Sequence, residues 1–363
     1  MHPPLQPDMQ PAPIIAKTSA GNFFEDFRIG QLINHATPRT VTVGDVAIYN
    51  GLFGPRFAVQ SSDAFAQKIG YPRAPIEDLL VFHIVFGKTV PDISLNAVAN
   101  LGYAGCRFLT PVYPGDTLNA VSEVIGLKEN SSHKTGIVFV RSAGHTADGS
   151  KVLEYVRWVM VRKRDEKAPA QGDHVPRLPE ALLPNTLGDA CPRIDVAAYD
   201  FTLAGSRYRF GDYAVGEKID HVDGITVEEA EHQIATRLYQ NTARIHFDQH
   251  SAAQGRFGRR LIYGGHVISL ARALSFNGLA NAFHVAAING GRHVSPLFAG
   301  ATVFAWSEVL ATADVPGRDD VGALRLRTVA TKDHPCADFP LKSGDEDDPA
   351  VLLDLDYWAL MPR

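Results

Sequence analysis

A histidine and a pair of adjacent glycines in this sequence are spaced so that they could transfer a proton beside a stabilised oxyanion. His246 lies in residues 238–248, and Gly265, preceded by Gly264, follows it by nineteen residues. Glycines at the start of a helix leave backbone N–H groups uncovered, where the helix terminus adds partial positive charge. Such a terminus stabilises an oxygen that gains negative charge, for example a thioester carbonyl becoming an enolate. A facing imidazole could move a proton to or from the adjacent carbon or a water.

The competing interpretation of the same residues is structural. Adjacent glycines are common in turns that close packing requires, and His246 would then be a core histidine with satisfied hydrogen bonds. The elements around these residues are needed to separate the two interpretations.

The chain contains one internal repeat, which predicts the architecture. Residues 24–30 are echoed by residues 210–216, and the tripeptide at 122–124 returns at 307–309. Three further residues recur 185 positions later: Arg107, Pro111 and Gly115 as Arg292, Pro296 and Gly300. The sequence therefore predicts two copies of one module, at 21–165 and 201–363. A Pro-rich linker that is flexible or wraps the modules spans 166–200, and residues 1–20 are expected to be a disordered tail.

Each copy shows the same order of elements. A helix-favouring stretch at 227–239 precedes a loop and an apolar helical stripe within 267–274, whereas the corresponding run 79–86 is apolar nearly all round. Strand-like runs follow at 137–141, 152–161, 323–329 and 351–360, and a polar insertion at 332–349 separates the last two. A buried helix followed by antiparallel strands describes a sheet wrapped around a helix. We expect an α+β fold in which the second copy covers the first as a pseudo-dimer.

Composition excludes several classes of protein. The 363 residues are 45% hydrophobic and 21% charged, with a net charge of −5, which is typical of a globular chain of about two domains. No window approaches the roughly 18 apolar residues of a membrane span, and no long basic run suits nucleic acid. Cys106, Cys191 and Cys336 lack the spacing of a disulfide framework or a zinc site. We expect a cytoplasmic protein without a membrane or nucleic-acid partner.

The second copy resembles the MaoC-like hotdog dehydratases, also called the (R)-specific enoyl-CoA hydratase family. That family carries Asp-x-Asn-Pro-x-His, then a His-Gly pair opening the central helix, then Pro-x-x-x-Gly-Asp at the start of a strand. The matching positions here are Asn241, Ala243, Arg244 and His246, then Gly264 and Gly265, then Pro296 and Gly300. Residues 86–92, 95–103 and 262–281 resemble most closely the double-hotdog branch that acts on mesaconyl-CoA. The resemblance implies two tandem hotdog modules, each an antiparallel sheet wrapped around a long central helix.

The resemblance also implies residue roles. His246 would be the proton carrier, and the amides of Gly264 and Gly265 would form the oxyanion hole. Asn241 replaces the family Asp, and because an amide is not a base, it would orient His246 or the water by hydrogen bonding. Asp248 is a possible substitute carboxylate, although the 185-residue offset pairs it with Asp63 of the first copy.

Several further residues are candidates with open alternatives. His266 could be a second acid or base, but a structural role is favoured, as it is for His221, which mirrors His35. His232 and His250 are expected to be surface or packing residues. The substrate implied by the resemblance carries a carboxylate and the coenzyme A phosphates. Its candidate binding residues are Arg260, Arg259, Arg244, Arg237 and Tyr263, and the sequence does not choose among the arginines.

The first copy lacks the catalytic residues. Subtracting 185 places Arg56 opposite Asn241, Ser61 opposite His246, and Leu79-Leu80 opposite the two glycines. We therefore expect one active site per chain, and the resemblance implies that the degenerate cleft holds the acyl chain or the coenzyme arm.

The expected reaction is reversible addition of water to mesaconyl-CoA (2-methylfumaryl-CoA), giving β-methylmalyl-CoA. The resemblance implies a dicarboxylic acyl-CoA pathway, such as the ethylmalonyl-CoA route, and a homodimer. No metal or redox cofactor is expected, because coenzyme A is part of the substrate. Three alternatives remain: a hydratase of other enoyl-CoA thioesters, a hotdog thioesterase, and a non-catalytic acyl-CoA-binding protein.

Overall fold

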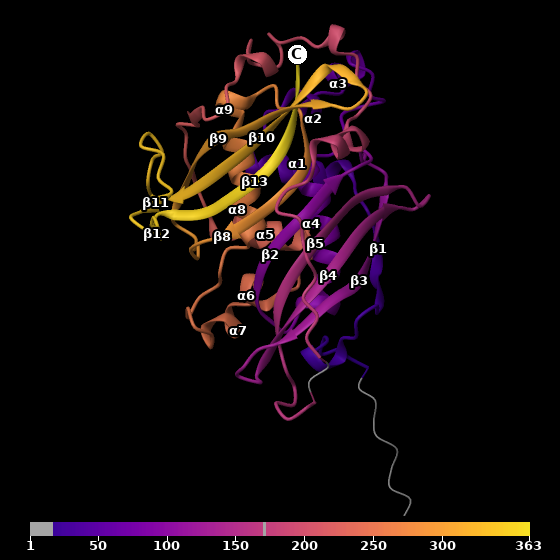
Figure 1. Ribbon diagram of the computed structural model, residues 1–363, viewed down its shortest axis with the longest axis vertical. Coiled ribbons are helices and arrows are strands. Elements are labelled where there is room, and N and C mark those ends of the chain that lie inside the picture. The colour runs from indigo at the N-terminus through magenta and orange to yellow at the C-terminus, as the bar shows by residue number, and fades with distance from the viewer. Residues whose placement is uncertain (1–16, 170–171) are drawn as a thin grey trace, which may run out of the picture.

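Both modules share one continuous sheet. The computed structural model describes residues 17–169 and 172–363, so most of the expected N-terminal tail lies outside the described residues. Within them, an 11-stranded antiparallel sheet runs in the order β1-β3-β4-β5-β2-β8-β13-β10-β9-β6, with β7 paired to β9, as Figure 1 shows. The expected α+β class is confirmed.

The N-terminal module places most of its helices before its long strands. Its elements are η1 (Phe24–Asp26), β1 (Leu32–Thr40), α1 (Val43–Phe53), α2 (Ala58–Ser61), α3 (Asp63–Lys68), α4 (Asp78–Thr89), η2 (Val90–Ser94), β2 (Ala97–Phe108), β3 (Thr117–Glu129), β4 (Thr135–Thr146) and β5 (Lys151–Arg162). Helix α4 is buried from Leu79 to Thr89, as its apolar sequence predicts. The strands β4 and β5 form the expected hairpin, whose turn residue Gly149 has a φ of 90°.

The C-terminal module repeats this order. Its elements are η5 (Phe210–Asp212), β6 (Lys218–Asp220), β7 (Ile225–Thr226), α5 (Glu229–Leu238), α6 (Arg244–Phe247), α7 (Gln249–Ala253), α8 (Gly264–Leu274), α9 (Phe276–Leu279), β8 (His284–His293), β9 (Thr302–Val315), β10 (Arg318–Lys332), β11 (Lys342–Ser343), β12 (Glu346–Asp347) and β13 (Val351–Pro362). The polar insertion contains the short hairpin of β11 and β12.

Strands β2 and β8 join the two modules in a register that follows the repeat. Tyr103 pairs with Gly291, and Cys106 pairs with Ile288. Gly291 lies 185 residues after Cys106, and Ile288 lies 185 residues after Tyr103, so each pair is the image of the other. A pseudo-twofold axis therefore passes between β2 and β8, and equivalent positions of the two modules are related by it.

The repeated histidines have equivalent structural roles. His35 bonds Asp92 through Nδ1 (2.7 Å) and the hydroxyl of Ser122 through Nε2 (2.8 Å). His221 donates from Nδ1 to the carbonyl of Asn277 (2.7 Å), and its Nε2 bonds the hydroxyl of Ser307 (2.8 Å). Both serines belong to the repeated tripeptide, so this part of the repeat preserves a buried hydrogen-bond network.

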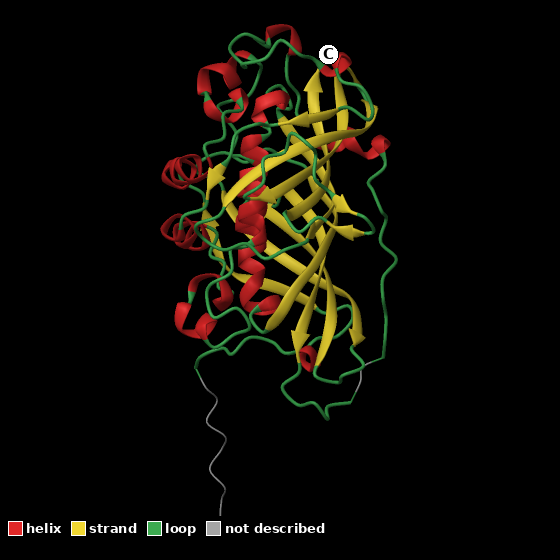
Figure 2. Ribbon diagram, turned by 90° about the vertical axis from the view of Figure 1, so that its left-hand side faces the viewer, coloured by secondary structure: helices red, strands yellow, loops and turns green. Residues whose placement is uncertain are grey.

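Helices and linker lie on opposite sides of the sheet. Figure 2 shows the helices gathered on one side and a loop segment running along the other. The linker contains η3 (Pro184–Ala190) and η4 (Val196–Ala198), and its buried Leu187 packs in one cluster with Trp358 and Leu360 of β13. The linker therefore packs along the sheet, and it shares this apolar cluster with Val59 of α2 and Phe65 of α3.

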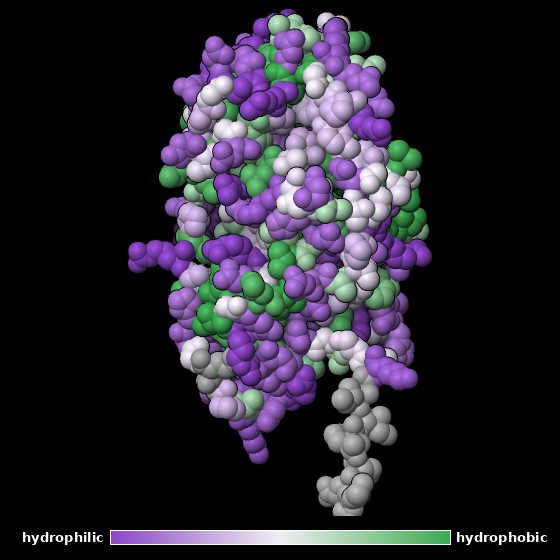
Figure 3. Space-filling view, turned by 90° about the vertical axis from the view of Figure 1, so that its right-hand side faces the viewer, coloured by the Kyte–Doolittle hydropathy of each residue, from purple (hydrophilic) through white to green (hydrophobic). Residues whose placement is uncertain are grey.

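The face of the molecule shown in Figure 3 is mostly polar. In the face shown in Figure 3, hydrophobic residues form separate patches among hydrophilic ones. No helix in the described residues has the length and hydropathy needed to cross a bilayer.

Candidate active site

The structure fixes which nitrogen of His246 carries the proton. This half-buried histidine lies in α6, and its Nδ1 donates to the carbonyl of Leu261 at 2.9 Å. A carbonyl can only accept, so Nδ1 is protonated and Nε2 keeps its lone pair. Burial lowers the pKa of His246 to about 4, although the bond to Leu261 acts in the opposite direction. The one hydrogen bond of the His246 ring within the described part of the chain uses Nδ1, so Nε2 is available as a base at neutral pH.

The glycine pair opens α8 as the sequence predicts. Tyr263 is the N-cap residue, and Gly264 and Gly265 are the first two helical residues. The N–H of Tyr263 donates to Nε2 of His232 at 2.9 Å, and the N–H of His266 donates to the carbonyl of Tyr263. Among the described residues, no acceptor bonds the amides of Gly264 and Gly265. Both point out of the helix terminus and can bind an oxyanion.

Close packing also requires these two glycines. A Cβ at Gly264 would overlap the imidazole of His293, and a Cβ at Gly265 would overlap the rings of Tyr263 and His83. The structural interpretation and the catalytic one are therefore compatible: removing side chains here both uncovers the amides and lets aromatic rings approach the helix terminus.

Five histidines surround this terminus, and we call them the histidine cluster: His83, His232, His246, His266 and His293. The ring of His246 lies 5.5 Å from the ring of Tyr263, and the ring of His232 lies 6.2 Å from His246 and 5.4 Å from His266, measured between centroids. The imidazole of His246 therefore lies beside the residue that precedes the glycine pair.

Burial lowers the pKa of every other histidine in the cluster. The values are about 3 for His83 and His266, about 2 for His232 and about 4 for His293, whose pKa is lowered further by the nearby His246. All are therefore neutral near pH 7. The site contains neutral imidazoles next to amides that have no hydrogen-bond acceptor. A neutral imidazole can therefore act as the base, and no charged side chain is needed for that role.

The N-terminal module supplies one wall of this site. His83 of α4 bonds the hydroxyl of Ser269 in α8 at 2.9 Å, and Tyr49 of α1 donates to the same hydroxyl at 3.0 Å. Gly87 of α4 packs against the backbone of Tyr239, where a Cβ would overlap its carbonyl. The site is thus formed between the modules.

Two predicted residues do not contact the imidazole. Asn241 is buried, and its side-chain oxygen accepts from the N–H of Ala243 at 3.1 Å; the Leu261 carbonyl, not Asn241, orients His246. Asp248 is the N-cap of α7 and accepts from the N–H and the hydroxyl of Ser251. Those bonds lower the pKa of the Asp248 carboxyl. The capping role matches the structural alternative for Asp248.

The predicted arginines lie outside the cluster. Arg260 pairs with Glu229 at 2.8 Å, the guanidinium of Arg259 lies 3.9 Å above the ring of Phe298, and Arg244 is exposed in α6. Arg237, also exposed, bonds the carbonyl of Gln233. Of these four, Arg260 is close enough to lower the pKa of His232.

Tyr263 and His266 are buried inside the site. The hydroxyl of Tyr263 lies 3.5 Å from Nδ1 of His83. His266 is 2% exposed, its ring packs on Phe53 at 4.7 Å, and its Nδ1 is buried without a partner in the described chain. Its position is the structural one expected, although one nitrogen is left unsatisfied.

Sequence reasoning missed His83, His293 and the Leu261 carbonyl. His83 interrupts an otherwise apolar run, and His293 directly follows the repeated Arg292, so both had a weak signal. A backbone carbonyl has none, because any residue type at 261 would supply it.

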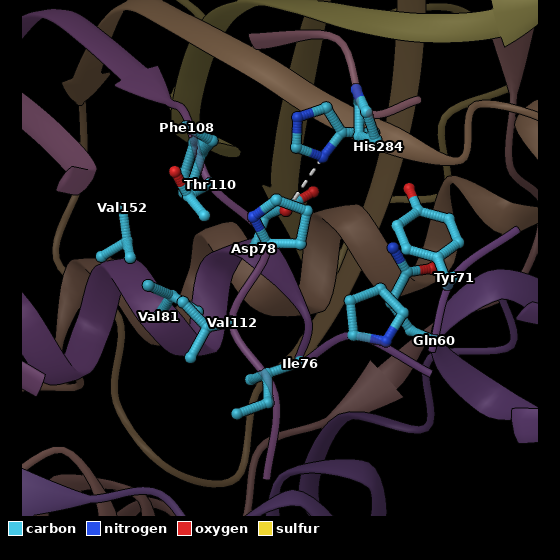
Figure 4. A pocket seen from close by; sticks show the side chains of 13 residues that line it. Gln60, Tyr71, Ile76, Asp78, Val81, Phe108, Thr110, Val112, Val152 and His284 are labelled. Carbon is cyan, nitrogen blue, oxygen red and sulfur yellow. Dashed lines mark ion pairs between the residues drawn. The ribbon is translucent and has the colours of Figure 1, made fainter. Parts of the chain in front are cut away.

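The equivalent cleft of the N-terminal module has different chemistry. Leu79 and Leu80 are buried at the start of α4, so no glycine pair uncovers its amides. A small cavity lies beside Asp78, whose carboxylate pairs with Nδ1 of His284 at 3.0 Å (Figure 4). Arg56 packs on Phe276 instead of entering this cleft. This half therefore has buried leucines where the other half has the glycine pair.

Despite the histidine cluster, no metal-binding arrangement is found within residues 17–169 and 172–363: no three or more His, Cys, Asp or Glu side chains there could jointly hold an ion.

Comparisons with known proteins agree on one family. The sequence model of the family described as mesaconyl-CoA hydratase matches residues 14–347. The chain is 64% identical to the β-methylmalyl-CoA dehydratase of Chloroflexus aurantiacus, over 96% of this chain and 99% of that protein. It is 60% identical to the mesaconyl-CoA hydratase of Cereibacter sphaeroides, over 96% of this chain and all of that protein.

Solved structures agree on the fold. A putative MaoC domain protein dehydratase from Chloroflexus aurantiacus superposes with a TM-score of 0.93 at 63% identity, over 96% of this chain and 99% of that one. A conserved hypothetical protein of Mycobacterium tuberculosis with a double hotdog fold gives a TM-score of 0.77 at 24% identity, over 94% and 99% of the two chains. The expected tandem hotdog architecture is confirmed.

Proposed function

The chain belongs to the mesaconyl-CoA hydratase family, and from that premise we propose that it catalyses the reversible hydration of mesaconyl-CoA to β-methylmalyl-CoA. It is a hydro-lyase of the hydratase and dehydratase type. The observation that supports the catalytic details is the position of His246, with Nδ1 fixed by Leu261 and Nε2 free, beside the glycine-opened terminus of α8.

Hydration begins with the thioester carbonyl in the oxyanion hole. The amides of Gly264 and Gly265 bind the carbonyl oxygen, which draws electron density from the double bond and makes the β-carbon electrophilic. Nε2 of His246 removes a proton from water while the water oxygen bonds the β-carbon. The resulting enolate is stabilised by the same amides and takes, at the α-carbon, the proton that the imidazolium of His246 now carries, so one water has been added overall.

Dehydration uses the same groups in reverse. Nε2 of the neutral His246 takes the α-proton as the enolate forms, and the resulting imidazolium returns that proton to the hydroxide expelled when the enolate collapses. A neutral resting imidazole suits both directions, because its lowered pKa keeps Nε2 unprotonated before hydration.

The coenzyme A part of the substrate needs cationic partners. Arg244, Arg259 and Arg260 lie along the segment from α6 to the start of α8 and could bind its phosphates. The proposed reaction needs neither a metal nor a redox cofactor, because the thioester and the oxyanion hole activate the double bond. The proposed assembly is a homodimer of the double module.

The test follows absorbance of the enoyl-thioester band with mesaconyl-CoA and, in parallel, crotonyl-CoA. Loss of the band without release of free thiol is the expected result with mesaconyl-CoA, and formation of β-methylmalyl-CoA is checked by mass spectrometry. Release of thiol would instead show a thioesterase, preference for crotonyl-CoA a hydratase of other chains, and an unchanged band with saturable binding a non-catalytic protein.

A further inference from the structure

Arg157 is a buried cation without a counter-ion. It lies in β5 with none of its surface exposed, and its guanidinium stacks 4.2 Å from the ring centre of Phe86. Nη2 donates to the hydroxyls of Thr89 at 2.7 Å and Ser94 at 3.4 Å, whereas Nε and Nη1 are buried and bond nothing in the described chain. No carboxylate in that part of the chain pairs with it. A buried charge without a counter-ion is unfavourable unless a bound anion neutralises it.

The pseudo-twofold axis relates Arg157 to a residue that lines a cavity in the other half. The residues that line this cavity include Leu79, Ala271, Arg272, Ile288, Leu355 and Tyr357. Leu79 is the equivalent of Gly264, so this cavity extends from the start of the central helix.

The strand register supplies the remaining equivalences. Tyr357 pairs with Ile288, and Arg157 pairs with Tyr103, the residue 185 positions before Ile288. Arg157 is therefore the equivalent of Tyr357. By the same register Tyr155 replaces Leu355, and the 185-residue offset puts Phe86 in place of Ala271. At these three positions the active half has Arg157, Tyr155 and Phe86, where the other half has Tyr357, Leu355 and Ala271.

Two further polar side chains lie in this region. Both side-chain polar atoms of Asn100 are buried without partners in the described residues, and the hydroxyl of Tyr155 lies near the hydroxyls of Thr89 and Ser142. Asn100 pairs with Val159, two residues from Arg157 on β5, so the two side chains share the face of the sheet turned to α4. A guanidinium, an amide and a phenol together provide the donors that a carboxylate binds.

This group is close to the reacting atoms. Phe86, which carries the guanidinium of Arg157 on its face, lies 5.7 Å from the ring of Tyr263, the residue before the glycine pair. Tyr103 connects the same region to His293, with ring centres 6.0 Å apart. The ring of Phe86 therefore lies between the guanidinium of Arg157 and Tyr263, the residue that precedes the oxyanion hole.

We propose that Arg157, assisted by Asn100 and Tyr155, binds the free carboxylate of the acyl group and makes the site specific for dicarboxylic acyl-CoA thioesters. The inference rests on the proposed function. In a trans-2-butenedioyl thioester the carboxylate and the thioester lie at opposite ends of the double bond, so anchoring the carboxylate at Arg157 places the thioester carbonyl at Gly264 and Gly265. The specificity residue thus comes from the N-terminal module, not from the arginines near α8.

Binding of unreactive thioesters tests this directly. Calorimetry compares 2-methylsuccinyl-CoA (thioester at C1) with 2-methylbutyryl-CoA, which has a methyl group in place of the carboxylate. We expect the full-length protein to bind the first at least about 30-fold more tightly, as for hydrogen bonds to a charged group. Arg157→Met should abolish this preference while changing the affinity for 2-methylbutyryl-CoA by less than about threefold. Arg157→Lys keeps the positive charge but loses the planar guanidinium that can donate two parallel hydrogen bonds to a carboxylate, so it should retain part of the preference.

Matched controls separate specificity from structure. Arg260→Gln should weaken both ligands equally, and Asn100→Leu should reduce the preference if Arg157→Met does not fold. The inference would be overturned if the wild-type protein showed no preference or if Arg157→Met kept it. It would also be overturned if Arg157→Met lost affinity for both ligands equally. A turnover assay with mesaconyl-CoA and tiglyl-CoA reports separately on the proposed function: failure of turnover with the binding preference intact would reject only the reaction.

Discussion

Two histidines with the same protonation differ in what they can do. His221 and His246 each donate Nδ1–H to a backbone carbonyl, and burial lowers the pKa of each to about 4. Nε2 of His221 is taken by Ser307, whereas the one hydrogen bond of the His246 ring within the described residues uses Nδ1. The free lone pair, not the pKa, therefore distinguishes the proposed base from the structural histidine.

Replacing the proposed base should remove turnover without unfolding the protein. We expect His246→Ala to lower kcat for mesaconyl-CoA at least about 100-fold, the usual contribution of a general acid or base. His266→Ala should have a milder effect, because its ring packs between Phe53 and His232. Thermal unfolding of both variants is the control. A larger kcat loss for His266→Ala would mean that the base has been assigned to the wrong histidine.

The pH profile should report the lowered pKa of His246. The base must be unprotonated, so kcat/KM is expected to stay level from about pH 8 to 5 and to fall below about pH 4, instead of near 6.5. An inflection close to 6.5 would contradict this expectation.

Stability must be followed in the same experiment. Burial lowers the folded-state pKa of His83, His221, His232 and His266 below the unfolded value, so the unfolded chain binds more protons as the pH falls below 6.5. Stability is therefore lost toward acid, and activity should be measured promptly and shown to return at pH 7.

At the scale of elements, the start of α8 combines catalysis with packing. Its first two residues have no side chains, so the amides stay uncovered while the rings of His293, His83 and Tyr263 approach the backbone. In α4 the equivalent residues are Leu79 and Leu80, whose side chains are buried there. The same helix in the same fold therefore offers an oxyanion hole in one module only.

A methyl group at the first glycine should disturb this arrangement. Gly264→Ala keeps the amide but places a Cβ in the imidazole of His293, so we expect kcat to fall at least tenfold and the free energy of unfolding to drop by about 1–3 kcal/mol. Gly51→Ala in α1 is the matched control: a Cβ there meets nothing within 4 Å, and a helical alanine should be neutral or stabilising. Equal activity in the two variants would reject the steric argument.

At the scale of the molecule, each module completes the other. His246, Gly264 and Gly265 belong to the second copy, whereas His83 and Gly87 come from the first, and β2–β8 pairing holds the halves in one sheet. The duplicated chain thus keeps one proposed catalytic site while the other half supplies its wall.

Separating the halves tests this dependence. Expressed alone, residues 1–165 and residues 166–363 should each be inactive, because each loses one wall of the site and exposes β2 or β8 as an unpaired edge. Co-expression should restore turnover of mesaconyl-CoA and a complex of the two fragments. Activity in the C-terminal fragment alone would show that the first module is dispensable.

The sequence by itself determined the repeat, the central helices, the hairpins and the pairing of His246 with the glycines. These features depend on hydrophobic periodicity and on residue types at short separation, and both can be read directly from the sequence. Only the tertiary structure decided that a backbone carbonyl orients His246, that Asp248 caps a helix, and that Arg157 lies unpaired behind Phe86. Arg157 is 89 residues before His246 in the chain, and its approach to the site depends on how β2 and β8 join the two modules in one sheet, a long-range packing outcome that local patterns do not encode.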